Sequence, residues 1–220
     1  MDHIVKVLKT DFVTHNVKRF VVEKPDGYAF VPGQATDVAI AKPGLEKELR
    51  PFTFTCLPSS DHLEFMIKIY TGHQGMTEKL LQVNAGDEFI LHDVFGTIHF
   101  DGPGLFLAAG AGITPFISIF RHLKEQNKLE GNTLLFANRT EDDIILKSEL
   151  KQLLGDNYLD VIEVPSSGGT GKRIDNDLLK QHLSTRKQFY YVCGPDKFTA
   201  IMIEALMSFG VEKSRIIIEQ

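Results

Sequence analysis

The stretch Leu105-Phe-Leu-Ala-Ala-Gly-Ala-Gly-Ile-Thr-Pro115 joins an apolar run to two glycines and a proline. It leads into Phe116-Ile-Ser-Ile-Phe-Arg-His-Leu-Lys124, where apolar residues recur at helical spacing. The pattern predicts a buried strand, a glycine turn and a helix. Backbone N–H groups converge at such a turn, so it is a candidate phosphate site. A tight connection without a ligand is the alternative, because Pro115 stands where the G-x-G-x-x-G motif has its third glycine.

The second half of the chain repeats this alternation of strand and helix. Strands are expected over residues 105–109, 133–137, 159–164, 189–193 and 215–218, and helices over residues 115–126, 146–154, 176–183 and 196–209. Apolar strands that alternate with helices predict a five-stranded parallel sheet covered on both faces.

The first half has a different rhythm. Short strand-like runs occupy residues 3–9, 17–23, 35–41, 52–56, 63–70 and 88–91, with a short helix over residues 77–83. Such a series predicts an antiparallel sandwich or barrel. The turn composition of Phe100-Asp-Gly-Pro-Gly104 divides the chain into a β-barrel over residues 1–101 and an α/β domain over residues 102–220. Because the connection is short, we expect a ligand site between the two domains.

Composition excludes several classes of protein. The 220 residues are 43% hydrophobic, carry a net charge of −5 and contain two cysteines, Cys56 and Cys193. This charge gives no general attraction to nucleic acid, and no apolar run is long enough to enter a membrane as a spanning helix. The absence of a signal-peptide pattern and of a disulfide framework predicts a cytoplasmic protein. No metal site is expected, and His73 is interpreted as a loop residue.

Two further motifs carry candidate chemistry. Arg50-Pro-Phe-Thr-Phe-Thr55 offers a guanidinium for a phosphate and an aromatic face for stacking, although a strand aromatic is more often core. Cys193-Gly-Pro195 ends a strand at the sheet edge where ligands bind in open α/β folds, although Cys193 also suits a small buried apolar position. Arg139, Lys172 or Arg173 can meet a nucleotide 2′-phosphate, or each can be a solvated loop charge.

In this order the motifs resemble those of the ferredoxin–NADP reductase superfamily, in which a flavin-binding β-barrel precedes a nicotinamide-nucleotide domain. Arg50-Pro-Phe-Thr53 is similar to its flavin motif, and Gly75-Met-Thr77 to the segment around the flavin pyrophosphate. Gly110 to Pro115 and Cys193-Gly-Pro195 match two motifs of its second domain, with Ala111 as a departure. Residues 136–146 are similar to the NADH-dependent cytochrome reductases of the superfamily.

The resemblance implies roles for particular residues. Arg50 would hold a flavin phosphate, Phe52 would stack on the isoalloxazine, and Cys193 would lie near the nicotinamide. The candidate catalytic residues are Thr53, Cys193 and Glu219, and the candidate cofactor-binding residues are Arg50, Pro51, Phe52, Thr53, Ile67, Gly75, Met76, Thr77, Gly110, Gly112, Thr114, Pro115, Arg139, Gly194 and Pro195. No aromatic residue follows Glu219, which predicts an open flavin face.

The implied activity is an FAD-dependent oxidoreductase, with FAD favoured over FMN. It would pass a hydride from NADH or NADPH to the flavin, and electrons on to a separate acceptor such as a flavodoxin or ferredoxin. The alternatives are a reductase of free flavin and a non-autonomous electron-transfer subunit. An acidic acceptor would need a basic docking face, for which Lys42, Lys47, Arg121 and Lys124 are candidates.

Overall fold

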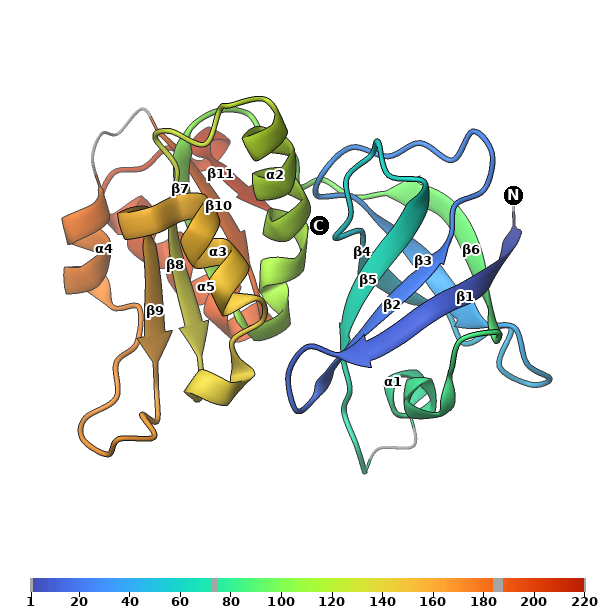
Figure 1. Cartoon of the computed structure of the whole chain (residues 1–220). Coiled ribbons are helices and arrows are strands. Elements are labelled where there is room, and N and C mark those ends of the chain that lie inside the picture. The colour runs from blue at the N-terminus through green and yellow to red at the C-terminus, as the bar shows by residue number, and fades with distance from the viewer. Residues whose placement is uncertain (1, 73–74, 184–187, 220) are drawn as a thin grey trace.

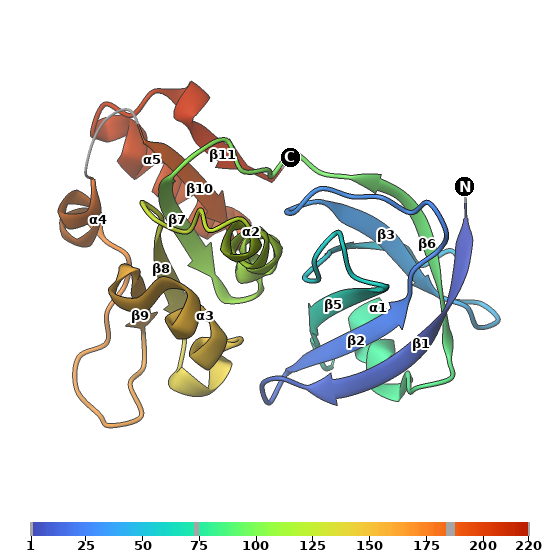
Figure 2. The same ribbon diagram turned by 45° about the horizontal axis from the view of Figure 1, so that its top comes forward.

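The computed structural model describes residues 2–72, 75–183 and 188–219, so His73 lies outside the described residues. The first half forms an antiparallel sheet that curls into a barrel (Figure 1). Its strands are β1 (His3–Phe12), β2 (Val17–Glu23), β3 (Ala35–Ile40), β4 (Arg50–Thr53), β5 (His62–Lys68) and β6 (Glu88–Phe95), in the order β4-β3-β6-β1-β2-β5. The edge strands β4 and β5 border the second half of the molecule, and Figure 2 shows β5 on the side of the barrel that faces α2.

Alternating side chains fill the barrel. In β1, Val5 and Val7 are buried while their neighbours face outward, as the period of two along a strand requires. The short helix α1 (Met76–Lys79) and the 3-10 turn Leu80–Gln82 pack against the same core. The Nζ of Lys18 donates to the carbonyl oxygen of Val83 at 2.6 Å, which ties this segment to β2.

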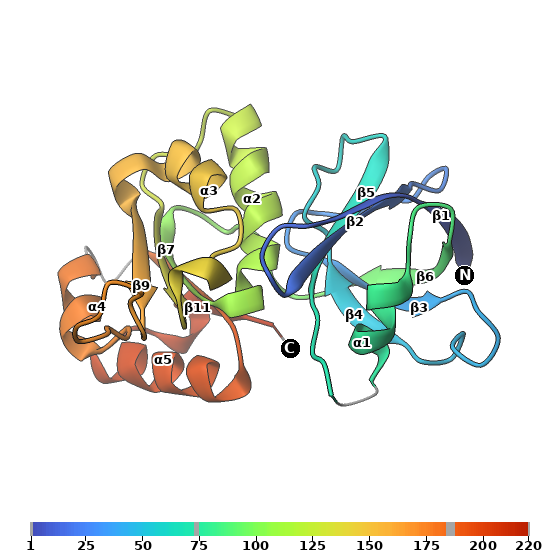
Figure 3. The same cartoon turned by 60° about the horizontal axis from the view of Figure 1, so that its bottom comes forward.

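The second half is a parallel sheet with helices on both faces (Figures 1 and 3). Its strands are β7 (Gly104–Ala109), β8 (Thr133–Asn138), β9 (Tyr158–Ile162), β10 (Phe189–Cys193) and β11 (Ile216–Ile218), in the order β11-β10-β7-β8-β9. Helices α2 (Thr114–Glu125) and α3 (Lys147–Leu154) share one apolar cluster with Phe106, whereas α4 (Asn176–His182) and α5 (Asp196–Ser208) share another with Leu107. Residues of β7 therefore alternate between the two covered faces.

The predicted fold class is confirmed, and the elements lie close to their predicted bounds. Strand β4 differs, because it begins at Arg50 and ends at Thr53, so Phe54 and Thr55 lie beyond it. The chain crosses from one sheet to the other between residues 95 and 104. The division into domains at residue 101 stays a proposal.

Contacts of two kinds join the halves. Val17 and Met66 of the barrel belong to the same apolar cluster as Ile117 of α2. At the rim, Nδ2 of Asn16 donates to Oδ1 of Asp143 at 3.5 Å. The barrel and the parallel sheet therefore pack against each other through a shared interface, in addition to being joined by the chain between residues 95 and 104.

Candidate functional site

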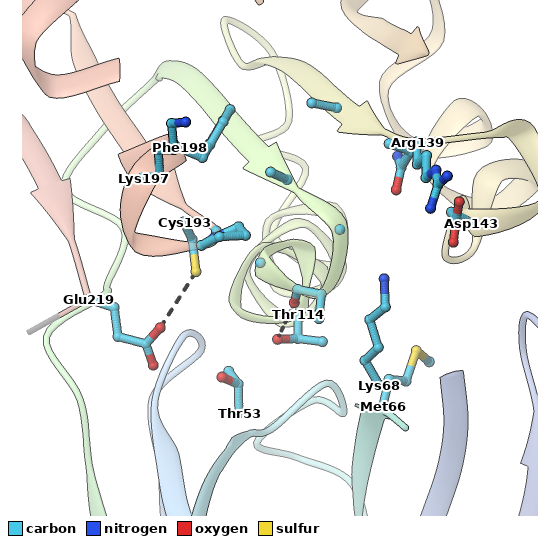
Figure 4. A pocket seen from close by; sticks show the side chains of 18 of the residues that line it. Thr53, Met66, Lys68, Thr114, Arg139, Asp143, Cys193, Lys197, Phe198 and Glu219 are labelled. Carbon is cyan, nitrogen blue, oxygen red and sulfur yellow. Dashed lines mark hydrogen bonds between the residues drawn. The ribbon is translucent and has the colours of Figure 1, made fainter. Parts of the chain in front are cut away.

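A cavity of about 810 Å³ opens between the two halves. Its walls come from β4 and β5 of the barrel and from the carboxyl ends of β7, β8 and β10. Figure 4 shows Cys193 and Glu219 on one side of it, Thr53 and Thr114 in the middle, and Lys68, Arg139 and Asp143 on the other. Ligands bind at the carboxyl edge of open parallel sheets, and this volume lies within the range of small-molecule sites.

The barrel supplies a mixed wall. Pro51, Phe52 and Thr53 come from β4, and Ile67 and Lys68 come from β5. Phe52 is half-buried and packs against the barrel core, and this contact fixes the position of its ring at the cavity wall. An apolar surface with a few polar groups suits a flat heterocycle.

The glycine turn forms the opposite wall. Strand β7 ends at Ala109, and residues Gly110–Ile113 make a 3-10 turn that leads into α2. Gly110 has a φ of +52°, which L side chains rarely adopt. The hydroxyl of Thr114 donates to the carbonyl of Ala111 at 3.0 Å, and Pro115 occupies the first turn of α2, as predicted. The positive end of the α2 dipole therefore faces the cavity.

Gly112 is a glycine for a reason that the sequence pattern does not contain. A Cβ at Gly112 would lie 2.3 Å from the carbonyl oxygen of Cys193, which is far inside contact distance. A Cβ at Gly194 would lie 2.9 Å from that of Ala109. The two motifs are thus fitted against each other, and the close approach of strand ends accounts for both glycines.

The carboxyl end of β10 carries a buried thiol. The Sγ of Cys193 donates to Oε2 of Glu219 at 3.6 Å (Figure 4). Burial, followed by the charge of Glu219, raises the pKa of Cys193 well above its ordinary value. The thiol therefore stays protonated, and it is not a nucleophile at neutral pH.

The end of β8 holds an unpartnered amide. Asn138 is 5% exposed and lines the cavity, and neither Nδ2 nor Oδ1 has a hydrogen-bond partner within the described ranges. Buried amides are nearly always satisfied, so this side chain points to a polar ligand. Nearby, Asp143 accepts from the hydroxyl of Thr140 at 2.8 Å and from its backbone amide at 3.1 Å. Burial would raise the pKa of Asp143, but these two bonds outweigh burial and lower it.

Most of the sequence-predicted residues lie together. The cavity wall contains Pro51, Phe52, Thr53, Ile67, Thr77, Gly110, Gly112, Thr114, Arg139, Cys193, Gly194, Pro195 and Glu219. Four candidates are outside it: Arg50 is exposed and donates to the carbonyl of Leu49, Gly75 caps α1, and Met76 and Pro115 are buried.

Two of the four candidates for a basic docking face are paired with carboxylates. Arg121 was expected to help form a basic docking face, but its side chain is only 19% exposed and is bound by Glu64 and Glu149. Lys42 is also neutralised, since its Nζ lies 2.8 Å from Oδ1 of Asp87. Lys47 and Lys124 remain exposed.

The sequence model of the oxidoreductase NAD-binding domain matches residues 106–204, which contain both the glycine turn and the Cys193 motif. The fold matches a ferredoxin NADP+ reductase from Neisseria gonorrhoeae, solved with bound FAD and NADP, at a TM-score of 0.80 and 21% identity over 99% of this chain and 97% of that one. In this matched domain and in its fold, the chain is similar to proteins of the ferredoxin–NADP reductase superfamily.

The curated relatives of the chain are named as reductases. It is 29% identical to the reductase component of propane 2-monooxygenase from Rhodococcus jostii, over 90% of this chain and 57% of that protein. It is also 29% identical to human cytochrome b5 reductase 4, over 96% of this chain and 46% of that protein. The CS-b5R domains of human Ncb5or align with a TM-score of 0.83 and 26% identity, over 99% of this chain and 69% of that one. The chain spans about half the length of these curated relatives.

The cavity fits the cofactors typical of this superfamily, which are FAD and NAD(P)H. The unpartnered amide of Asn138 and the turn before α2 suit a nucleotide, and the β4–β5 wall suits a planar ring. Sequence reasoning missed Asn138, Lys68 and Asp143. A signal existed for Asn138, because polar residues at the carboxyl end of a parallel strand reach the ligand edge.

Proposed function

We propose that this protein is a flavoprotein reductase that takes a hydride from NADH or NADPH and passes electrons to a separate acceptor. One observation carries the proposal: a single cavity is bounded by the barrel strand β4 and by the carboxyl edge of the parallel sheet. Such a cavity would bring a flavin and a nicotinamide face to face. Bound flavin supplies the chemistry that couples a two-electron donor to a one-electron acceptor.

The barrel side would hold the flavin. Phe52 would cover the ring, Thr53 would offer its hydroxyl to a ring nitrogen, and Ile67 would line the edge. Arg50 lies exposed at the start of β4 and would hold a flavin phosphate with the guanidinium N–H groups that do not donate to Leu49. Backbone N–H groups of Gly75, Met76 and Thr77 would meet the pyrophosphate.

The α/β side would hold the nucleotide. Gly110, Gly112 and Thr114 would receive its phosphates beside the α2 dipole, and Gly194 and Pro195 would flank the nicotinamide. Arg139 is exposed at the end of β8 and would contact the adenosine part. Cys193 would keep its proton and pack its sulfur against the nicotinamide, with Glu219 orienting the S–H bond.

The acceptor is proposed to be a small redox protein of the flavodoxin or ferredoxin type. The support is indirect: the named relatives are reductases of a monooxygenase and of a cytochrome. The part of the chain that the structure describes has no helix long and apolar enough to cross a membrane, nor a group of three or more ligating side chains placed for a metal ion. The cytoplasmic location expected from the sequence stays a proposal.

An absorption spectrum of the purified protein, before and after anaerobic addition of NADH or NADPH, tests the function. Flavin bands that stay with the protein through gel filtration and bleach on addition support a reductase with resident flavin. Bleaching only of added, freely exchanging flavin would replace it with the free-flavin reductase. A protein that neither holds FAD nor oxidises either nucleotide would overturn both.

A further inference from the structure

Helix α2 is fastened to the barrel through Arg121. The Nη1 of Arg121 donates to Oε1 of Glu64 in β5 and to the carbonyl oxygen of Thr55, both at 2.7 Å. Its Nε and Nη2 bind the two oxygens of Glu149 in α3 at 2.6 and 2.9 Å. One guanidinium therefore connects both halves of the chain.

On the barrel side, neighbouring residues hold the carboxylate of Glu64 in place. Glu64 is 7% exposed, accepts from the Thr55 hydroxyl at 2.8 Å and lies 3.8 Å from Nη1 of Arg19. One turn before Arg121 in α2, the fully buried Ser118 donates to the carbonyl of Cys56 at 2.8 Å. Ser118 and Arg121, one turn apart in α2, thus donate hydrogen bonds to the backbone carbonyls of two consecutive residues just beyond β4.

Helix α2 and the segment just beyond β4 that it contacts both continue into the walls of the cavity. Helix α2 begins at Thr114, which lines the α/β wall, and the segment with Thr55 continues from Thr53 in the barrel wall. Strand β5 carries Glu64 and, beyond it, Met66, which also lines the cavity. A rotation of α2 against the barrel would move the two walls relative to each other.

We propose that Arg121 and Glu64 form an interdomain clamp that fixes the glycine turn at a set distance and angle from Thr53, which makes Arg121 a positioning residue. The inference rests on the proposed hydride transfer between the two walls. Hydride transfer depends steeply on alignment, and a displacement of about 1 Å costs about a hundred-fold in rate.

Stability alone does not account for the clamp. A buried ion pair gains little net stability over a well-packed apolar pair, because both charges lose water. Nη1 of Arg121 instead makes two hydrogen bonds to the barrel, one to the Glu64 carboxylate and one to the Thr55 carbonyl, so two separate points of the barrel define its position. Burial by itself would lower the pKa of Arg121, but the hydrogen bonds that it donates to Glu149 and the charge of Glu64 outweigh burial and raise the pKa, so the guanidinium stays charged.

A matched pair of variants tests the clamp. Glu64→Ala removes the cross-domain carboxylate, whereas Glu149→Ala removes a carboxylate from the same guanidinium within the α/β half. With FAD and NADH, we expect Glu64→Ala to slow flavin bleaching in stopped flow about ten-fold or more, with nucleotide affinity unchanged. Glu149→Ala should stay within about two-fold. Should Glu64→Ala not fold, Glu64→Gln replaces it and should slow bleaching in the same direction.

A second measurement does not depend on turnover. Spin labels at Ile4→Cys (65% exposed) and Asp177→Cys (88% exposed side chain) place one label on each half, while the native cysteines are buried. Electron–electron distance measurement should give one narrow distribution for the parent and Glu149→Ala, and a broadened or shifted one for the Glu64 variants.

The outcomes separate the two proposals. An unchanged distance distribution in the Glu64 variants overturns the clamp, whatever the activity. A changed distribution with bleaching at the parental rate would leave the contact structural and overturn the positioning role. A parent that shows no nucleotide oxidation removes the proposed function, and with it the positioning role.

Discussion

The thiol of Cys193 and the carboxylate of Glu219 meet at the cavity although they lie 26 residues apart in the sequence. The register of two parallel strands brings them together, since Val192 of β10 pairs with Ile218 of β11. Each strand then leaves its next residue at the same sheet edge. The pair is therefore a product of the fold, and it orients an S–H bond that burial keeps protonated.

Replacing Cys193 tests the role of that thiol. We expect Cys193→Ala to slow flavin reduction by NADH or NADPH about ten-fold, because the nicotinamide loses a packing partner at the reacting distance. Flavin should remain bound, since Cys193 lies on the α/β side of the cavity. Stopped-flow reduction together with FAD titration measures both. Reduction at the parental rate would remove Cys193 from the catalytic residues.

The amide of Asn138 leads to a prediction with opposite signs for binding and stability. Asn138→Ala removes two buried polar atoms that have no partner in the described part of the chain, so the free energy of unfolding should not fall. Nucleotide affinity should weaken about ten-fold, because one or two hydrogen bonds are lost at ~1 kcal/mol each. NADH titration and thermal unfolding of the same variant check the two signs.

Asn132 offers the matched control. It is buried, as Asn138 is, but its Oδ1 accepts from the Gly104 amide at 3.2 Å and its Nδ2 donates to the carbonyl of Leu129 at 3.0 Å. Asn132→Ala should therefore destabilise the fold by about 1–3 kcal/mol and leave nucleotide affinity unchanged. If both variants behave alike, the Asn138 amide has no ligand role.

The sequence is informative where physics is local. A run of apolar residues followed by glycines and a helical pattern requires only neighbouring residues, so β7, its turn and α2 could be predicted. Strand–helix alternation likewise places Gly110 and Cys193 at one sheet edge. The order of strands within each sheet needs long-range pairing, which the pattern alone does not contain.

Side-chain partners are where sequence reasoning fails. Arg121 was expected to be a free surface charge, because nothing near it in sequence indicates that Glu64 would lie against it. The unsatisfied state of Asn138 likewise depends on what the packing places around it. Helix α5 shows the same effect: of two adjacent apolar residues, Ile201 is 48% exposed and lines the cavity, while Met202 is buried.

Two glycines of the same turn should respond differently to alanine. Gly110→Ala meets no atom within 4 Å but keeps a φ of +52°, which costs about 1–2 kcal/mol of folding free energy. Gly112→Ala collides with the backbone of Cys193 and Gly194, so it must displace β10. We expect a larger loss of stability there, together with slower flavin reduction. Chemical denaturation measures the loss of folding free energy in each variant. Equal losses for both variants would contradict the close approach of Gly112 to the backbone of Cys193.

The thiol of Cys56 gives a stability prediction at alkaline pH. Burial raises the pKa of Cys56 from 9.0 to about 11, although the Glu64 amide donates to its sulfur at 3.3 Å. The unfolded chain therefore releases this proton first, and the stability that the neutral thiol contributes below pH 9 is lost as the pH rises to 11. The expected loss is about 3 kcal/mol, from two pKa units.

Comparison with Cys56→Ala isolates that contribution. The variant should be less stable at pH 8, because a buried side chain is shortened, but this deficit does not depend on pH. The unfolding free energy of the parent should then fall by about 3 kcal/mol relative to that of the variant between pH 8 and pH 12. Cys193 titrates in both proteins and cancels. Parallel stability curves across this range would show that Cys56 ionises equally in the folded and unfolded chains.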